Sequence, residues 1–324
     1  MNKKITFVLV LALAAFLVMG SASAGLFDFL GGGSGDTVKI GYLPSDHDAA
    51  LFVADAQGKY AEKNITTELV QFNNGGDLMT AMASGEVDVG YVGIAPVLSS
   101  VAKGVPVKVI SSAQTDGSGI VVTKESGITS AADLKGKSIA TPGEASIQYV
   151  LLTYYLKENN LSTDDLNISA MKVPSMNDAL KTKQIDGIIT FQPYVSIAAN
   201  NSDNVVLEDS ADILPNHPCC VVVASDDFIK NHEDTVKDII AIHKEATDFI
   251  NEQIAAGNAS AVVKLLPEDI VSDGDLEALS LESFPFISGI DKDFKADVDT
   301  FQQLEVDIGI LNGTVSQDKL YWEA

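Results

Sequence analysis

Polar and small residues that can bind a solute gather in five short segments, at residues 43–48, 73–77, 93–96, 141–146 and 191–194. Each segment follows a predicted strand and precedes a predicted helix or turn. In open parallel sheets, ligands collect at the carboxyl ends of strands, beside helix N-termini with free N–H groups. The segments supply hydrogen-bond donors and glycines that admit a ligand close to the backbone: Ser45, Asn73, Asn74, Thr141, Ser146, Gln192, Gly75, Gly76, Gly93 and Gly143. We therefore expect a binding site rather than five unrelated helix caps.

Two other groups of residues offer metal or redox chemistry. The run Asp46-His47-Asp48 holds imidazole and carboxylate ligands, but adjacent side chains rarely converge on one ion, so no metal site is predicted there. Cys219 and Cys220 are the chain's two cysteines. Neighbours on a strand point to opposite faces, so we expect two small buried hydrophobic residues. A redox pair or a soft-metal site is the alternative.

Motifs of catalysis are missing from the sequence. It contains neither a G-x-S-x-G elbow nor an H-E-x-x-H pair, and Ser118 falls in a hinge-like loop. Two of the four histidines, His232 and His243, fall in a helical C-terminal region and are expected to face solvent. We predict a protein that is not an enzyme and that carries no cofactor and no metal.

The elements that must position these segments alternate between strand and helix, which requires parallel strands joined by crossover helices. A faint repeat at a constant offset relates Pro44 to Pro142 and Asp88 to Asp186. Two similar α/β units in tandem indicate two lobes with a cleft between them. From residue 226 onward the periodicity is helical, and no further strand is expected.

The lobe boundaries follow from two breaks in this pattern. Residues 114–119 interrupt the alternation as a hinge would, and the apolar run 219–224 returns the chain to the first unit. We predict that residues 37–114 and 219–324 form lobe one, and that residues 115–218 form lobe two.

The N-terminus and the charge restrict the location and the partners. Lys3 and Lys4, an apolar run and a small-residue site form a secretory signal over residues 1–24, and a Gly-rich flexible linker follows at 25–36. An extracytoplasmic protein is expected, tethered to the membrane if the signal is not cleaved. The net charge is −24 and the chain has no Arg, which excludes nucleic acid as a partner.

Three stretches carry a resemblance to a known family: IGYLPSDHDAALFVADAQGKYAEKNI, GGDLMTAMASGEVDVGYVGIAPVLSSVAKGVPVKVI and ITSAADLKGKSIATPGEASIQYVLL. They resemble the periplasmic solute-binding proteins of the nitrate/sulfonate/taurine ABC importers, a family that also contains binders of thiamine-pyrimidine precursors. The likeness covers roughly residues 38–250. It implies a two-lobed periplasmic-binding-protein fold of type II, with two parallel or mixed sheets, flanking helices and a central cleft that closes by a hinge.

The resemblance also implies a monomeric protein that delivers a small-molecule solute to an ABC transporter permease. The expected ligand-binding residues, from the resemblance and from the strand-end segments together, are Pro44, Ser45, Asp46, His47, Asn74, Gly75, Gly93, Ile94, Ala95, Thr141, Gly143, Ala145, Ser146, Gln192 and His217.

The ligand class follows from the charges near these positions. Without Arg, and with carboxylates in the first loop and Glu144 in the matching one, a taurine-like zwitterion or a polar heterocycle is favoured over nitrate. These carboxylates can alternatively cap their helices and face water. The alternative ligands are a thiamine-pyrimidine precursor, nitrate and bicarbonate. The alternative functions are an enzyme of the same fold and a sensory binding protein.

Overall fold

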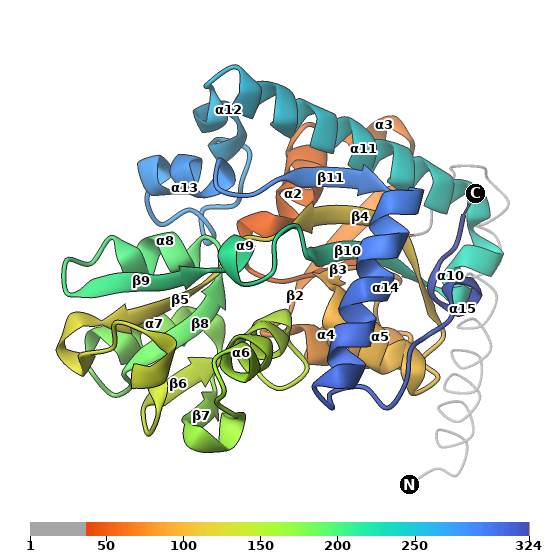
Figure 1. The fold of residues 1–324 in the computed structure, drawn as a ribbon. Coiled ribbons are helices and arrows are strands. Elements are labelled where there is room, and N and C mark those ends of the chain that lie inside the picture. Colours follow the sequence, from red (N-terminus) through yellow and green to blue (C-terminus); the bar gives the residue numbers. More distant parts are fainter. Residues whose placement is uncertain (1–36, 324) are drawn as a thin grey trace, which may run out of the picture. The chain divides into compact units, whose positions relative to one another are not determined.

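The computed structural model describes residues 37–323, whose strands form two mixed sheets (Figure 1). Sheet A has the order β11-β4-β10-β3-β1-β2, and sheet B has the order β7-β6-β8-β5-β9. The strands of sheet A are β1 (Thr37–Tyr42), β2 (Thr66–Gln71), β3 (Val89–Gly93), β4 (Val107–Thr115), β10 (Pro218–Ser225) and β11 (Phe286–Gly289). Those of sheet B are β5 (Ser118–Thr123), β6 (Ser138–Thr141), β7 (Asn167–Ala170), β8 (Gly187–Phe191) and β9 (Asn204–Asp209). The expected signal (1–24) and linker (25–36) lie outside the described residues.

Both sheets combine parallel crossovers with antiparallel returns. In sheet A, β1 pairs parallel with β3, while β10 runs antiparallel between β3 and β4. In sheet B, β6 pairs parallel with β7 and β8, and β5 runs antiparallel to β8 and β9. The predicted fold class, two sheets of α/β type with flanking helices, is confirmed. Because β4 leads directly into β5, the carboxyl end of sheet A lies next to sheet B.

Helices and short 3-10 turns flank the two sheets. They are η1 (Asp46–Asp48), α2 (Ala49–Ala56), α3 (Lys59–Glu62), α4 (Gly75–Ser84), α5 (Ile94–Ala102), η2 (Lys124–Ser126), η3 (Ala131–Leu134), α6 (Ile147–Glu158), η4 (Thr163–Asp165), α7 (Val173–Lys181), α8 (Tyr194–Ala199), α9 (Ser210–Ile213), α10 (Asp226–Asn231), α11 (Glu233–Ala255), α12 (Ala259–Val263), α13 (Gly274–Leu281), α14 (Lys292–Asp307) and α15 (Gln317–Leu320). Two side chains fix helix starts that matter below: the Asn74 side chain accepts from the Asp77 amide, and the Ser146 hydroxyl accepts from the Tyr149 amide.

The core of each sheet comes from short apolar strands covered on both faces. All residues of β3 and β8 are buried, and β10 is buried over residues 218–224. Such continuous apolar runs are typical of strands with helices on both sides. Each buried valine of β10 contributes about 1.5–3 kcal/mol by leaving water, so the central strands hold the strand ends in fixed positions.

Two sequence-based expectations about these elements were wrong. Residues beyond 226 are not all helical, because β11 pairs antiparallel with β4 as an edge strand. Its four residues are mostly half-buried, so it lacks the apolar run that marks an inner strand. Ser118 is not a loop residue but begins β5, and only Asp116 and Gly117 separate β4 from β5.

Among the described residues, no helix combines the length and the apolar character needed to cross a membrane.

Candidate functional site

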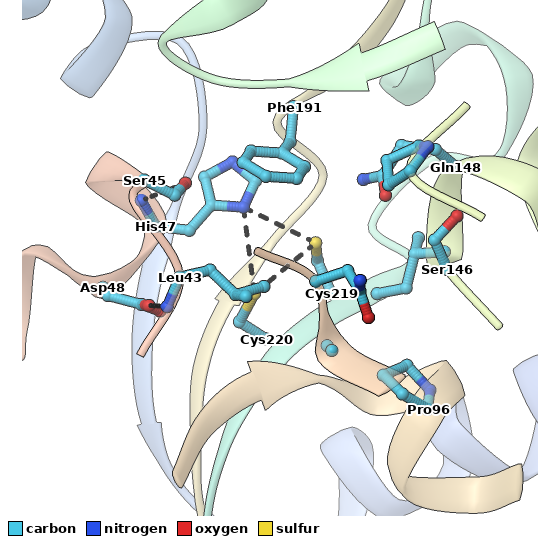
Figure 2. A pocket seen from close by; sticks show the side chains of 15 residues that line it. Leu43, Ser45, His47, Asp48, Pro96, Ser146, Gln148, Phe191, Cys219 and Cys220 are labelled. Carbon is cyan, nitrogen blue, oxygen red and sulfur yellow. Dashed lines mark hydrogen bonds between the residues drawn. The ribbon is translucent and has the colours of Figure 1, made fainter. Parts of the chain in front are cut away.

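A cavity lies where the loops of the two sheets meet (Figure 2). Its volume is about 40 Å³, more than the roughly 10–15 Å³ that one water needs. It is lined by Leu43, Ser45, His47, Asp48, Asn74, Gly75, Gly93, Pro96, Pro142, Ser146, Ile147, Gln148, Phe191, Cys219 and Cys220. Among these lining residues none is a lysine, and most of the groups are apolar or neutral.

The lining residues come from strand ends of both sheets, as the sequence predicts. Sheet A contributes the loop after β1, the starts of α4 and α5, and the first residues of β10. Sheet B contributes the turn after β6, the start of α6 and the last residue of β8. Three helices, α4, α5 and α6, therefore begin at the cavity, after Asn74, Gly93 and Ser146. Helix N-termini attract anions, so they supply positive potential to a cavity without a lysine.

His47 is a buried imidazole held in one orientation. Its Nε2 lies 3.1 Å from the carbonyl oxygen of Gly117. A carbonyl only accepts, so Nε2 carries the proton and donates, which leaves the Nδ1 lone pair available in the neutral ring. The side-chain amide of Gln114 contacts this Nδ1. Phe284 packs edge-on against the ring with the centroids 4.7 Å apart.

Both cysteine sulfurs face His47, which the sequence did not predict. The Sγ atoms of Cys219 and Cys220 lie 3.7 and 3.8 Å from His47 Nδ1 and 4.0 Å from each other. The expectation that adjacent strand residues point to opposite faces was wrong here. The pairing of β10 with β4 shifts register on both sides of Cys220, and such a bulge re-aims a side chain. The two thiols and the imidazole thus form one cluster, and the cysteines are not two separate hydrophobic residues (Figure 2).

The cluster is electrostatically coupled. Burial alone would raise the pKa of the Cys219 thiol, but the hydrogen bond from Cys220 and the nearby charge of His47 hold that pKa well below its ordinary value. Burial alone would lower the pKa of His47, but the Cys219 sulfur and the two flanking aspartates raise it. The pKa of Cys220 is raised by its hydrogen bond to Cys219 and by burial. The three groups therefore shift one another's pKa values.

The carboxyl groups beside His47 are buried rather than facing water. Asp48 Oδ2 accepts from the Leu43 amide at 3.0 Å, and burial raises the pKa of Asp48 to about 8. Asp46 accepts from the Ser280 hydroxyl at 2.5 Å, and burial raises its pKa. Glu277 on α13 has a raised pKa because of burial and the nearby charge of Asp46. With pKa values raised to about 8 and about 9, Asp48 and Glu277 keep their protons near neutral pH, whereas Asp46, at about 6, is largely ionised. Fewer carboxylates therefore repel an anionic solute than the sequence suggests.

Direct contacts join the two sheets around the cavity. The Ser45 hydroxyl donates to the carbonyl oxygen of Gln192 at 2.8 Å. On the sheet B side, Gln148 Nε2 donates to Ser118 Oγ at 2.8 Å, which fixes one of the lining side chains. A Cβ built on Gly93 would lie 3.1 Å from Ile147 Cδ1, so the backbone of sheet A touches the first residue of α6. Residues that line the cavity from opposite sides thus hold each other in place.

Six of the expected ligand-binding residues line this cavity: Ser45, His47, Asn74, Gly75, Gly93 and Ser146. The others take different positions in the structure. Pro44, Asp46, Ile94, Ala95 and Thr141 are buried beside the cavity, while Ala145 is exposed and Gly143 half-buried. Gln192 bridges to Ser283 Oγ at 3.2 Å and to the Ser196 amide at 3.1 Å.

His217, expected near the cleft, is buried at a second cavity. Its Nδ1 donates to the Leu214 carbonyl at 2.8 Å and lies 3.1 Å from Asp116 Oδ1. Its ring stacks on Phe301 of α14. The second cavity offers about 550 Å³ and is lined by α14 and the turn before β10, with Asp297, Asp299 and Asp307 on its rim. Another histidine, His243, was expected to face solvent but is fully buried, between the Tyr91 hydroxyl at 3.2 Å and the Ser112 carbonyl at 2.8 Å.

Nine lining residues were missing from the expected set: Leu43, Asp48, Pro96, Pro142, Ile147, Gln148, Phe191, Cys219 and Cys220. Five of them, Leu43, Asp48, Pro96, Pro142 and Phe191, lie inside the predicted strand-end segments, and Ile147 and Gln148 directly follow the segment 141–146. The cysteines had a signal of their own, a vicinal pair at the start of a strand that returns to sheet A.

Comparisons with known proteins place this geometry in a family. The model of the NMT1-like family matches residues 32–267. The taurine-binding periplasmic protein of Escherichia coli is 28% identical over 252 residues, covering 75% of this chain and 76% of that protein. The 4-amino-5-hydroxymethyl-2-methylpyrimidine phosphate synthase of Aspergillus parasiticus is 26% identical over 238 residues, covering 68% of this chain and 69% of that protein.

A solved structure supports the fold independently. The ligand-binding component of an ABC-type import system from Staphylococcus aureus, with zinc bound, superposes with a TM-score of 0.77 at 22% identity, covering 88% of this chain and 96% of that one. The structural neighbours have the periplasmic-binding-protein fold, as the resemblance implied. The match over most of the chain and the shared fold show that the protein belongs to the NMT1-like family.

Proposed function

We propose that the chain is the extracytoplasmic solute-binding component of an ABC importer. It captures a small polar organic solute of the sulfonate or taurine class between two lobes and delivers it to a permease. Residues 37–114 and 219–324 form lobe one and residues 115–218 form lobe two. The observation that carries the proposal is the cavity lined from both sheets at their strand ends.

The chemistry of the cavity favours an organic sulfonate over a small inorganic anion. Leu43, Pro96, Pro142, Ile147 and Phe191 give the solute an apolar surface. Three helix N-termini stabilise an anionic end without Arg or Lys. Hydroxyl and amide groups of the lining bind an amine or further oxygens. The E. coli relative that is named for taurine, an aminosulfonate, supports the same class.

Capture works through a shift between open and closed arrangements. Contacts such as that from Ser45 to the Gln192 carbonyl form only when the two sheets approach. A solute that touches both walls adds its own contacts to these and favours the closed form. The permease then recognises the loaded, closed monomer.

Titration calorimetry on the full chain tests the proposal, with taurine, ethanesulfonate, nitrate, bicarbonate and an aminopyrimidine as titrants. We expect one molecule of taurine or sulfonate per chain, bound at about micromolar Kd, near −8 kcal/mol. Phe191→Ala should weaken binding about 10-fold or more because it removes an aromatic wall of the cavity. Phe249→Ala on α11, outside the cavity lining, is the matched control and should leave the Kd unchanged.

Two results would contradict the proposal. One is tight binding of a solute that Phe191→Ala does not weaken, which would place the site elsewhere. The other is chemical conversion of the aminopyrimidine, detected by mass spectrometry, which would make the chain an enzyme like the synthase of A. parasiticus.

A further inference from the structure

We infer that His47 Nδ1, Cys219 Sγ and Cys220 Sγ together bind one thiophilic metal ion of the Zn²⁺ class. The three ligand atoms lie within 4.8 Å of one another and all three residues are buried. They come from two distant parts of the chain, the loop after β1 and the start of β10, which the fold brings together (Figure 2). This inference goes beyond the proposed function, because the metal site and solute binding are separable properties.

The spacing of the ligand atoms matches a tetrahedral site. With Zn–S about 2.3 Å and Zn–N about 2.0–2.1 Å, tetrahedral angles separate the ligand atoms by about 3.5–3.8 Å. The observed separations are 3.7 and 3.8 Å from nitrogen to sulfur and 4.0 Å between the sulfurs. An ion at the centre therefore requires side-chain movements of only a few tenths of an ångström. Imidazole and thiolate are also the ligand types that Zn²⁺ prefers.

The surroundings of His47 orient it for metal binding. Metal-ligating histidines almost always donate their other ring N–H to a carbonyl or carboxylate, which fixes the tautomer. Here Nε2 donates to the Gly117 carbonyl at 3.1 Å, so Nδ1 presents its lone pair toward the sulfurs. Gln114 contacts the same Nδ1 through its amide and must turn aside when an ion binds. Its Oε1 has no hydrogen-bond partner among the described residues, so the side chain is not held at both ends.

Charge and burial also fit a divalent ion. Two thiolates and a neutral imidazole balance the charge of Zn²⁺, so the loaded cluster is neutral and its burial carries no net charge. Three protein ligands leave one tetrahedral position for water or for a polar group of a solute. Because all three residues line the cavity, that fourth ligand has room to enter.

Metal binding to the tag-free full chain tests the inference. The protein is reduced and its two thiols are counted before equilibrium dialysis against Zn²⁺, so that a disulfide between the neighbours cannot obscure the result. We expect one Zn²⁺ per chain. Co²⁺ in its place should give sulfur-to-metal charge-transfer absorption, which reports thiolate ligands directly. Cys219→Ser, Cys220→Ser and His47→Gln should each weaken Zn²⁺ binding at least about 100-fold, beyond the 10–100-fold typical of losing an outer-shell partner.

His232→Gln is the matched control, since His232 lies at the start of α11 outside the cluster. It should bind Zn²⁺ like the wild type. Thermal unfolding without metal shows that each variant folds, and the Co²⁺ spectrum distinguishes ligand loss from a general weakening. The inference is overturned if the reduced protein with two free thiols binds no Zn²⁺. It is also overturned if binding persists in the three variants or Co²⁺ shows no thiolate band. If protein treated with a chelator still binds taurine, the proposed function is supported whether or not the chain binds Zn²⁺.

Discussion

The two walls of the cavity differ in chemistry. The wall from sheet A carries the titratable groups, with His47, Cys219, Cys220 and Asp48 packed together. The wall from sheet B offers an amide, a hydroxyl, an aromatic ring and aliphatic side chains, and no residue there is titratable. The wall of sheet A therefore determines charge and metal chemistry, while the wall of sheet B supplies shape and neutral hydrogen bonds. A solute held between them responds to pH through one wall only.

The largest loss of stability is expected from a substitution of Gly117, where the two walls join. Its φ is +78°, and a Cβ there would lie 2.5 Å from His47 Nε2. Gly117→Ala should lower the free energy of unfolding by about 3 kcal/mol or more, from backbone strain and the displacement of His47. Gly127→Ala is the matched control, because its φ is +69° with nothing within 4 Å of the added Cβ. It should lose only about 1–2 kcal/mol. Equal losses in urea unfolding would mean that the contact with His47 is unimportant.

Glu305, a buried acid outside both walls, gives the stability of the whole fold a pH dependence of its own. This dependence has to be removed before the pH response of the sheet A wall can be measured. Glu305 on α14 is buried, neither of its carboxyl oxygens has a partner among the described residues, and burial raises its pKa from 4.5 to about 8. The folded form keeps its proton between these values while the unfolded form loses it. The contribution of Glu305 to stability is therefore greatest below about pH 4.5 and falls by about 1.4 kcal/mol per pH unit up to about pH 8.

Glu305→Gln should remove this slope, so its advantage over wild type should be about 2 kcal/mol at pH 6 and should grow by about 1.4 kcal/mol per pH unit up to about pH 8. Exposed Glu282→Gln serves as the control and should track the wild type. Urea unfolding at several pH values measures both variants. A Glu305→Gln profile parallel to wild type would show that this acid does not titrate as described. The pH dependence that remains in Glu305→Gln then belongs to other groups, those of sheet A among them.

A substitution of Gln148 tests the wall from sheet B, which carries no titratable residue. Its Nε2 donates to Ser118 Oγ at 2.8 Å, and its side chain lines the cavity. Gln148→Ala should weaken taurine or sulfonate binding about 10-fold, about 1.4 kcal/mol, and leave Zn²⁺ binding unchanged. Gln71→Ala, at the exposed end of β2, is the control. Calorimetric titrations with taurine and with Zn²⁺ measure both affinities. A loss of Zn²⁺ affinity would show that the walls are not chemically independent.

The smallest effect is expected at the contact that ties the walls together. Ser45→Ala removes the hydrogen bond to the Gln192 carbonyl, so the closed form should lose about 1 kcal/mol and solute affinity should fall about 5-fold. Exposed Ser260→Ala should change neither quantity. If Ser45→Ala instead tightened solute binding, the contact would not belong to the closed form.

Much of the fold was predictable from the sequence because the central strands are apolar runs between turn residues. The same logic found the cavity region, since carboxyl ends of parallel strands meet at one edge. Ser45, His47 and Ser146 follow from it. Edge strand β11 did not, because one buried residue followed by three half-buried ones gives no periodicity.

The metal-binding geometry could not be predicted from the sequence. The orientation of Cys219 and Cys220 depends on a bulge that arises from the pairing of β10 with β4, a contact between residues far apart in the chain. The burial of Asp46, Asp48 and His243 likewise depends on helices α11 and α13 packing from the C-terminal part. Local sequence contains neither piece of information.

The central claim is that one solute contacts both walls of this cavity, and a crystal structure of the full chain with its tightest-binding solute tests it most directly. We expect solute density between Gln148 and Phe191 on one side and His47 and Cys219 on the other. Solute density in the second cavity, between Tyr154 and Phe301, with the first cavity unchanged, would contradict it.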